Sequence, residues 1–171
     1  MRKPTVVMIG LAAVMLCFAA LASAGVVAPT KVSAGVHKAK RPALTYTTTG
    51  RITYPRRYCL AGTTSSAYCV TLTAKKVCNG RVSLTVKLGK DPLLAASNKT
   101  IARASGKVKS NCTYSIKTKL KTKPFAAKKS FAAHAKGATV KVSFGIRFLG
   151  NAVLNPRNAR TQTVKVSVKQ P

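Results

Sequence analysis

The stretch "CTYSIKTKLKTK", residues 112–123, alternates between two kinds of side chain from one position to the next. Even positions hold cysteine, tyrosine, isoleucine, threonine and leucine, whereas odd positions hold threonine, serine and then lysine. A period of two is that of a β-strand with one buried face and one face in water. The wet face then carries a row of four lysines, Lys117, Lys119, Lys121 and Lys123. The stretch therefore predicts a half-buried strand with a strongly positive outer surface.

The same alternation recurs from residue 44 to the end of the chain. Inward positions of several segments are filled by valine, leucine, isoleucine or phenylalanine, and turn sequences such as Asn79-Gly80 separate them. Residues 125–137, rich in alanine, predict one or two helical turns between strands. One-sided alternation predicts an all-β fold, a seven-stranded antiparallel β-sandwich over residues 44–171. The expected strands are 44–54, 67–74, 80–88, 98–109, 111–123, 138–149 and 159–169.

The N-terminal residues 1–24 have the three parts of a secretory signal peptide. Arg2 and Lys3 precede an apolar run, which ends in the small residues Ala22-Ser23-Ala24. We expect cleavage near Ala24, and a secreted or cell-envelope location for the mature chain. An uncleaved membrane anchor is the alternative, since the run approaches the length of a spanning helix. Residues 25–43 show no sustained period and are interpreted as a flexible basic leader.

Four cysteines remain once Cys17 is removed with the signal peptide. An even number of cysteines in an exported chain predicts two disulfides. Cys78 and Cys112 share the parity of the inward residues of their strands, so we expect them to pair inside the sandwich. Cys59 and Cys69 would then form a local disulfide. Zinc binding is the competing interpretation, but paired C-x-x-C spacing is missing.

Three stretches resemble the bacterial immunoglobulin-like domains of secreted and surface proteins, over about residues 44–169. They are "CNGRVSLTVKLG", "NCTYSIKTKL" and "VKVSFGIRFLGNAVLNPRNARTQTVKVSV". Such domains often have an Arg-Phe-x-Gly-Asn turn, here residues 147–151, before a last valine-rich strand. The resemblance implies an immunoglobulin-like sandwich in a secreted or surface protein. It assigns no ligand, because one sandwich fold carries many unrelated functions.

The charge balance argues against an enzyme. The 171 residues include 31 Lys and Arg but a single acid, Asp91, for a net charge of +30. General acid–base pairs, glycosidase carboxylates and calcium sites all need at least two acids. His37 and His134 have no regular spacing to each other or to Asp91. We therefore expect no catalytic residue, metal, cofactor or small-molecule substrate.

A folded chain with this surface is expected to bind anionic polymers such as a wall polymer, anionic lipid head groups or extracellular DNA. Besides the strand lysines, outward bases on other strands qualify. The loop "TYPRRYC" adds Arg56 and Arg57 between tyrosines, which can stack on bases or sugars or, alternatively, pack on the core. The candidate polyanion-binding residues are Lys117, Lys119, Lys121, Lys123, Arg81, Lys87, Lys141, Arg147, Lys165, Lys169, Arg56 and Arg57.

Other interpretations of the charge remain open. Lysines on strands can simply keep edges from pairing and keep a protein soluble. The chain can also be a structural or adhesive module that binds a surface protein, with incidental charge. A third possibility is a membrane-active cationic protein, although the sequence has no amphipathic helix of useful length.

Overall fold

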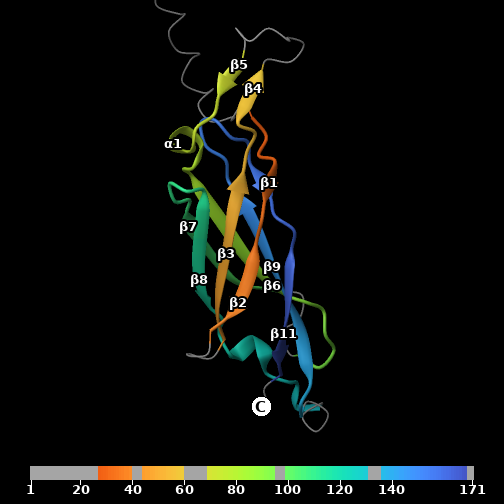
Figure 1. Cartoon of the computed structure of the whole chain (residues 1–171). Helices are drawn as coiled ribbons and strands as arrows, with labels where there is room; N and C mark the ends of the chain where they lie inside the picture. Colours follow the sequence, from red (N-terminus) through yellow and green to blue (C-terminus); the bar gives the residue numbers. More distant parts are fainter. Residues whose placement is uncertain (1–26, 40–43, 60–68, 95–98, 131–135, 169–171) are drawn as a thin grey trace, which may run out of the picture.

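The computed structural model describes residues 27–39, 44–59, 69–94, 99–130 and 136–168. The predicted signal peptide and Lys169 lie outside the described residues. Within these ranges the chain is mostly β-structure, with antiparallel sheets and two disulfides. The strands divide into two main sheets and one small hairpin (Figure 1).

The first sheet is built around β3 (Thr45–Thr53). On one side β3 pairs with β8 (Thr113–Lys119), and on the other side it pairs with two short strands in succession. These are β1 (Lys31–Val32) and β2 (Gly35–Lys38). Every pairing is antiparallel, and Val32 is buried beside Ile52 at the end of β3.

The second sheet is wider and has β9 (Thr139–Phe148) and β6 (Arg81–Leu88) at its centre. Beyond β6 lies β7 (Lys99–Lys107), and beyond β9 lie two shorter strands, β10 (Arg157–Asn158) and β11 (Gln162–Ser167). All these strands run antiparallel to their neighbours.

Three small elements complete the described fold. A hairpin of β4 (Arg57–Cys59) and β5 (Cys69–Thr71) projects beyond the sheets at the top of Figure 1. It leads into α1 (Ala74–Val77), and a 3-10 turn, η2 (Lys123–Phe125), follows β8.

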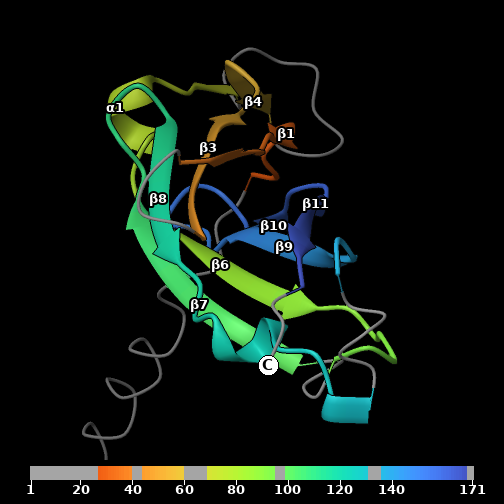
Figure 2. The same cartoon turned by 90° about the horizontal axis from the view of Figure 1, so that it is seen from below.

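The inner faces of the two sheets share one hydrophobic core. The ring of Tyr46 on β3 lies 5.3 Å, between centroids, from that of Phe144 on β9. Along one side β7 of the second sheet runs beside β8 of the first (Figure 2). Along the other, β1 approaches β10 and β2 approaches β11. The inward residues predicted from alternation are buried, apart from the half-buried Val164.

The prediction of a flexible leader is wrong for residues 31–38, because β1 and β2 pair with β3. Val32 is buried, and this segment covers the free side of β3. Strands of two and four residues are too short to show a period of two. The seven predicted strands correspond to β3, β5, β6, β7, β8, β9 and β11. With the short β1, β2, β4 and β10, the described residues contain eleven strands rather than seven.

Two element boundaries also differ from the sequence expectation. The strand predicted over 111–123 ends at Lys119, because Thr122 adopts a helical backbone and Pro124 lies in the turn η2. The strand predicted over 67–74 ends at Thr71, and α1 begins at Ala74. Helical turns were expected over 125–137. The turn η2 reaches into the start of this segment, residues 129–130 are also in a 3-10 conformation, and residues 131–135 lie outside the described ones.

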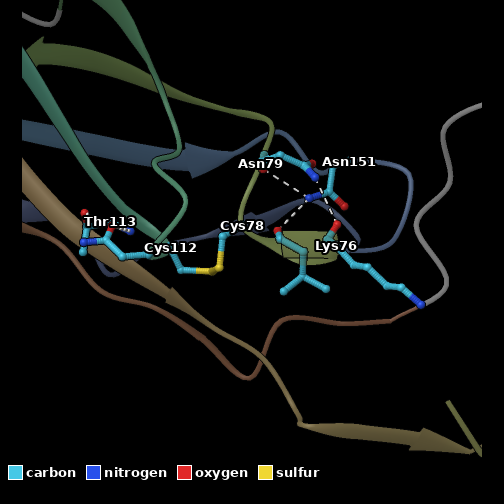
Figure 3. Close-up of a disulfide and its surroundings, with 8 residues drawn as sticks. Lys76, Cys78, Asn79, Cys112, Thr113 and Asn151 are labelled. Carbon is cyan, nitrogen blue, oxygen red and sulfur yellow. Dashed lines mark hydrogen bonds between the residues drawn. A yellow bond between two sulfur atoms is a disulfide. The ribbon is translucent and has the colours of Figure 1, made fainter. Parts of the chain in front are cut away.

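Both predicted disulfides are confirmed. Cys59 and Cys69 are directly paired residues of the β4–β5 hairpin. Cys78, at the end of α1, is linked to Cys112 in the turn before β8, and both are buried (Figure 3). Shared parity thus placed Cys78 and Cys112 in the same interior.

The Arg-Phe-x-Gly-Asn stretch forms a turn organised by Asn151. Its side-chain amide donates to the carbonyl oxygens of Val77 and Asn79, at 3.0 and 3.1 Å (Figure 3). Its Oδ1 accepts hydrogen bonds from the backbone N–H groups of Val153 and Leu154, at 2.8 and 2.7 Å. Asn151 therefore fixes its own loop and fastens that loop beside the Cys78–Cys112 disulfide.

A buried tyrosine joins β8 to the link between β1 and β2. The Tyr114 hydroxyl donates to the Ser33 carbonyl oxygen at 2.6 Å. To reach Ser33, the Tyr114 side chain passes over Gly50, the residue directly opposite it on β3. A Cβ at Gly50 would lie 2.0 Å from the Ser33 oxygen and 2.4 Å from the Tyr114 oxygen, so this position requires glycine.

Candidate polyanion-binding surface

The strand pairing gathers most of the predicted outward bases on one surface, the outer face of the second sheet. Arg81 and Lys87 project from β6, Lys141 and Arg147 from β9, and Lys165 from β11; all five are exposed. Their neighbours along each strand point into the core, so the alternation that builds the core also sets these bases outward.

Strand β7 adds two exposed bases that the sequence analysis missed. Arg103 pairs with Thr85 and Lys107 pairs with Arg81, so both share the outer face. The alternation was present in the sequence, but the inward residues of β7 are small. At Gly106 a Cβ would come within 2.8 Å of the Ile116 side chain on β8, which explains why this strand lacks large apolar residues.

Two pairs of bases lie directly opposite each other on neighbouring strands. Lys141 is paired with Lys165, and Arg81 with Lys107. Like charges in such positions are destabilising, by about 0.8 kcal/mol in water at roughly 5 Å before salt screening. The chain has one acid, Asp91, and its carboxylate accepts a hydrogen bond from the Leu93 N–H at 2.9 Å in the connection after β6. Neither pair is neutralised by a carboxylate of the chain.

Between these pairs the surface is hollowed into an open groove of about 590 Å³. Gly145 contributes no side chain to it; a Cβ there would meet only the Thr85 carbonyl oxygen, at 3.7 Å. Lys87, Arg103 and Arg147 also line the groove. Its other lining residues are mainly small or hydroxyl-bearing and include no aromatic ring: Ser83, Thr85, Thr100, Ile146, Leu149, Asn158, Ala159 and Thr161.

One base on this face is held by a hydrogen bond. The Arg81 Nη2 donates to the Ser105 Oγ on the neighbouring strand, at 2.8 Å. Ser105 lies two residues before Lys107 on β7, and Lys107 is the residue directly opposite Arg81. The Arg81 guanidinium therefore reaches diagonally across the face, from β6 to β7. The bond restricts the guanidinium to the sheet surface and leaves its other N–H groups as donors.

The predicted row of four lysines is divided in the structure. Lys117 and Lys119 are exposed on β8, opposite Thr47 and Thr45, and belong to the outer face of the first sheet. Lys121 and Lys123 follow the strand, and with Lys99 they line a separate pocket of about 290 Å³. The prediction of one continuous lysine row is therefore wrong, because the alternating sequence continues past the end of the strand.

The loop "TYPRRYC" packs its tyrosines rather than presenting them. Tyr54 and Tyr58 are half-buried against the core, whereas Arg56 and Arg57 are exposed. Arg56 lines a pocket of about 330 Å³ that also includes Arg51 and the Cys78–Cys112 disulfide. The structure thus places Arg56 with a base that the sequence analysis had not singled out.

The groups with shifted pKa values lie in the core and not on this surface. Burial raises the pKa of Tyr114 to about 12, and burial also raises the pKa of Tyr46. Within the described residues, no group of three or more His, Cys, Asp or Glu side chains could hold a metal ion. The described part of the chain also includes no helix long and apolar enough to span a membrane.

Comparisons with known proteins add no assignment. The chain matches no protein-family model, no curated protein and no solved structure. The function must therefore be inferred from the surface of the protein itself.

Proposed function

We propose that this chain is an exported, non-enzymatic binding protein that associates with anionic envelope or extracellular polymers through the outer face of the second sheet. One observation carries the proposal: this face holds seven exposed bases and no acid. The seven are Arg81, Lys87, Arg103, Lys107, Lys141, Arg147 and Lys165.

The mechanism is electrostatic and needs no chemical step. Bases fixed on strands neutralise the charges of a polymer and release its counterions, so affinity falls with salt. If all seven bases contact charges, log K falls with log salt with a slope of about −5 for a single-stranded polymer. The groove lining has no aromatic ring to stack on bases, so little sequence preference is expected.

The strand order supports an immunoglobulin-like sandwich as the scaffold. The first sheet has the order β2–β3–β8 and the second β11–β9–β6. In chain order these correspond to strands A-B-E and G-F-C of the immunoglobulin fold. Strand β7 lies beside β6, the position of C′ in the variable-type domain. This agrees with the resemblance drawn from the sequence.

The test compares two triple variants in urea-free buffer. Lys87→Gln, Arg103→Gln and Arg147→Gln together remove three charges from the proposed face. The matched variant removes the same charge from Lys117, Lys119 and Lys121. Elution from a heparin column and titration with inorganic polyphosphate measure binding at several salt concentrations.

We expect the first variant to elute at lower salt. Its slope of log K against log salt should be smaller by about 2, since three contacts are lost at about 0.7 each. The matched variant should have the smaller effect. Equal effects would mean that binding is spread over the whole surface. Failure of the wild-type protein to bind any of these polymers in dilute buffer would refute the proposal.

Export can be examined separately. Expression of the full chain in a bacterial host, followed by mass spectrometry of the product, should find a mature N-terminus at Gly25. An intact N-terminus in the membrane fraction would favour the anchor instead.

A protein-binding role is the second candidate, and two exposed apolar side chains favour it. Val70 on β5 is 52% exposed, and Leu149, which lines the groove, is 47% exposed. Binding of a surface protein that does not weaken with salt, and that is lost in Val70→Ser, would support this role.

A further inference from the structure

We infer that the outer face of the second sheet binds a linear chain of phosphate groups along one diagonal, held at each end by a like-charged pair. The two pairs are Lys141 with Lys165, and Arg81 with Lys107. This inference depends on the proposed function and specifies its ligand chemistry, direction and length. It does not follow from net charge, because net charge has no direction.

The register gives the length of the diagonal. The N–H of Leu149 bonds to the Arg81 carbonyl, so Arg81 lies level with Leu149, eight residues along β9 from Lys141. The centres of the two pairs are also two strands apart in the sheet. At about 3.4 Å per residue and 4.8 Å per strand, the pairs are about 29 Å apart.

The groove lies between the two pairs and supplies the middle of the diagonal. Arg147 pairs with Ser83, Arg103 with Thr85, and Lys87 with Ser143, so successive levels of the sheet each hold one base. Arg147 lies on the β9 side of the diagonal, and Arg103 and Lys87 lie on the β7 side, each about 5–7 Å from it. A chain on this path would therefore pass within reach of one long basic side chain at each step of about 7 Å. The Thr85 hydroxyl can donate to anionic oxygens between the bases, whereas the Ser83 hydroxyl donates to the Arg147 carbonyl oxygen at 3.3 Å.

Gly145 lines the groove, in the interior of the central strand β9. Glycine in a strand interior weakens the strand, and it often marks a site where another chain approaches the backbone closely. Nothing within the protein needs the space, because the nearest atom to a Cβ would be 3.7 Å away. The backbone packing therefore does not explain the glycine, whereas the close approach of a ligand does.

Phosphate groups fit this surface better than bases or sugars do. A phosphate has several anionic oxygens and can accept charge-assisted hydrogen bonds from two cations at once, as each pair requires. The groove has no ring on which a base or sugar could stack. Recognition would be limited to the charged backbone of the ligand.

The experiment titrates the full-length mature protein with inorganic polyphosphates of increasing, defined chain length. We expect affinity to rise with length until the extended chain reaches about 29 Å, and to change little beyond that. The variant Lys141→Gln with Lys165→Gln should reach its plateau at about 20 Å, where Lys87 is the last base. Its slope of log K against log salt should fall by about 1.4. The control variant Lys128→Gln with Lys129→Gln, exposed after η2, should keep the wild-type plateau.

A second variant tests the groove without changing any charge. Gly145→Val fills the floor beside Thr85 and suits a β-strand. We expect at least a fivefold loss of affinity for polyphosphate with an unchanged salt slope. Wild-type affinity in Gly145→Val, together with an unchanged plateau in the Lys141/Lys165 variant, would overturn the inference while polyphosphate binding itself upheld the proposed function. Absence of polyphosphate binding at every length would refute the inference, and it would refute the proposed function as well if heparin also failed to bind. Tighter binding of heparin than of polyphosphate would refute only the choice of phosphate.

Discussion

Two glycines in the middle of strands predict opposite responses to the same substitution. Gly50 on β3 is overlaid by the Tyr114 hydroxyl and the Ser33 carbonyl oxygen, at 2.4 and 2.0 Å from an added Cβ. Gly145 on β9 has only the Thr85 carbonyl oxygen near an added Cβ, at 3.7 Å. We therefore expect Gly50→Ala to destabilise the fold and Gly145→Ala to stabilise it.

The magnitude at Gly50 follows from three contributions. Displacing the Ser33 backbone costs about 1–3 kcal/mol, the usual cost of overpacking. Losing the bond from Tyr114 to Ser33 costs about 1 kcal/mol. The lower entropy of the unfolded alanine chain returns about 0.4–1 kcal/mol. The net loss is about 2 kcal/mol, whereas Gly145→Ala keeps only the gain of about 0.4–1 kcal/mol.

Urea unfolding of both variants and of the wild type, followed by circular dichroism, measures these differences. Urea is chosen because guanidinium chloride would screen the repulsion among the bases and change the reference state. The disulfides are kept oxidised in all three proteins. The midpoint should fall for Gly50→Ala and rise slightly for Gly145→Ala, with similar slopes m.

The sign of the contrast decides whether the reasoning holds. A Gly50→Ala variant as stable as the wild type would mean that Tyr114 does not cross β3 to reach Ser33. The conclusion that residues 31–38 cover the free side of β3 would then be wrong. The double variant Gly50→Ala with Tyr114→Phe supplies a further check, because removing the hydroxyl should recover only part of the loss. The backbone contact with Ser33 remains in that variant.

Three further predictions concern the connections around the core. Asn151→Ala loses four hydrogen bonds and should lower the free energy of unfolding by about 3 kcal/mol, whereas the exposed Asn158→Ala should change it by less than about 0.5 kcal/mol in the same urea assay. Replacing Cys78 and Cys112 by alanine opens a loop with a sequence separation of 34 and should cost about 3.8 kcal/mol by loop entropy, measured by calorimetry. Burial raises the pKa of Tyr114 to about 12, above its value of about 10 in the unfolded chain. The stability that comes from keeping the Tyr114 hydroxyl protonated in the folded chain is therefore intact below pH 10 and is lost as pH rises from about 10 to 12. The Tyr114→Phe variant should lose less stability than the wild type over that range.

Alternation in the sequence predicted the parts of the fold where one face is filled by large apolar residues. Phe144 and Ile146 on β9, like Tyr114 and Ile116 on β8, are buried as expected. The same parity correctly paired Cys78 with Cys112, although Cys78 ends α1 and Cys112 lies in the turn before β8, so that both residues are buried just outside the strands whose parity they share.

Alternation failed where packing uses small residues or short segments. The bases of β7 were missed because its inward residues are alanine and glycine, which pack closely on β8 and leave no apolar signal. Lys121 and Lys123 were placed on a strand because parity says nothing about where a strand ends. Pro124, inside the turn that follows, carried that information. The role of Val32 depends on the open side of β3, which only the assembled sheet reveals.

The cost of holding like charges together is small enough that charge alone does not establish a function. Each facing pair costs about 0.8 kcal/mol before screening, whereas the Cys78–Cys112 disulfide contributes about 3.8 kcal/mol by loop entropy. A surface shaped only for solubility could therefore carry the same bases without losing the fold. The outer face of the second sheet is distinguished by two features together: bases without an acidic partner, and Gly145 between them, where the protein leaves room for a side chain. Solubility explains exposed lysines, but it does not explain Gly145, where the strand gives up a side chain that would fit. A ligand that approaches the backbone between the bases accounts for both features.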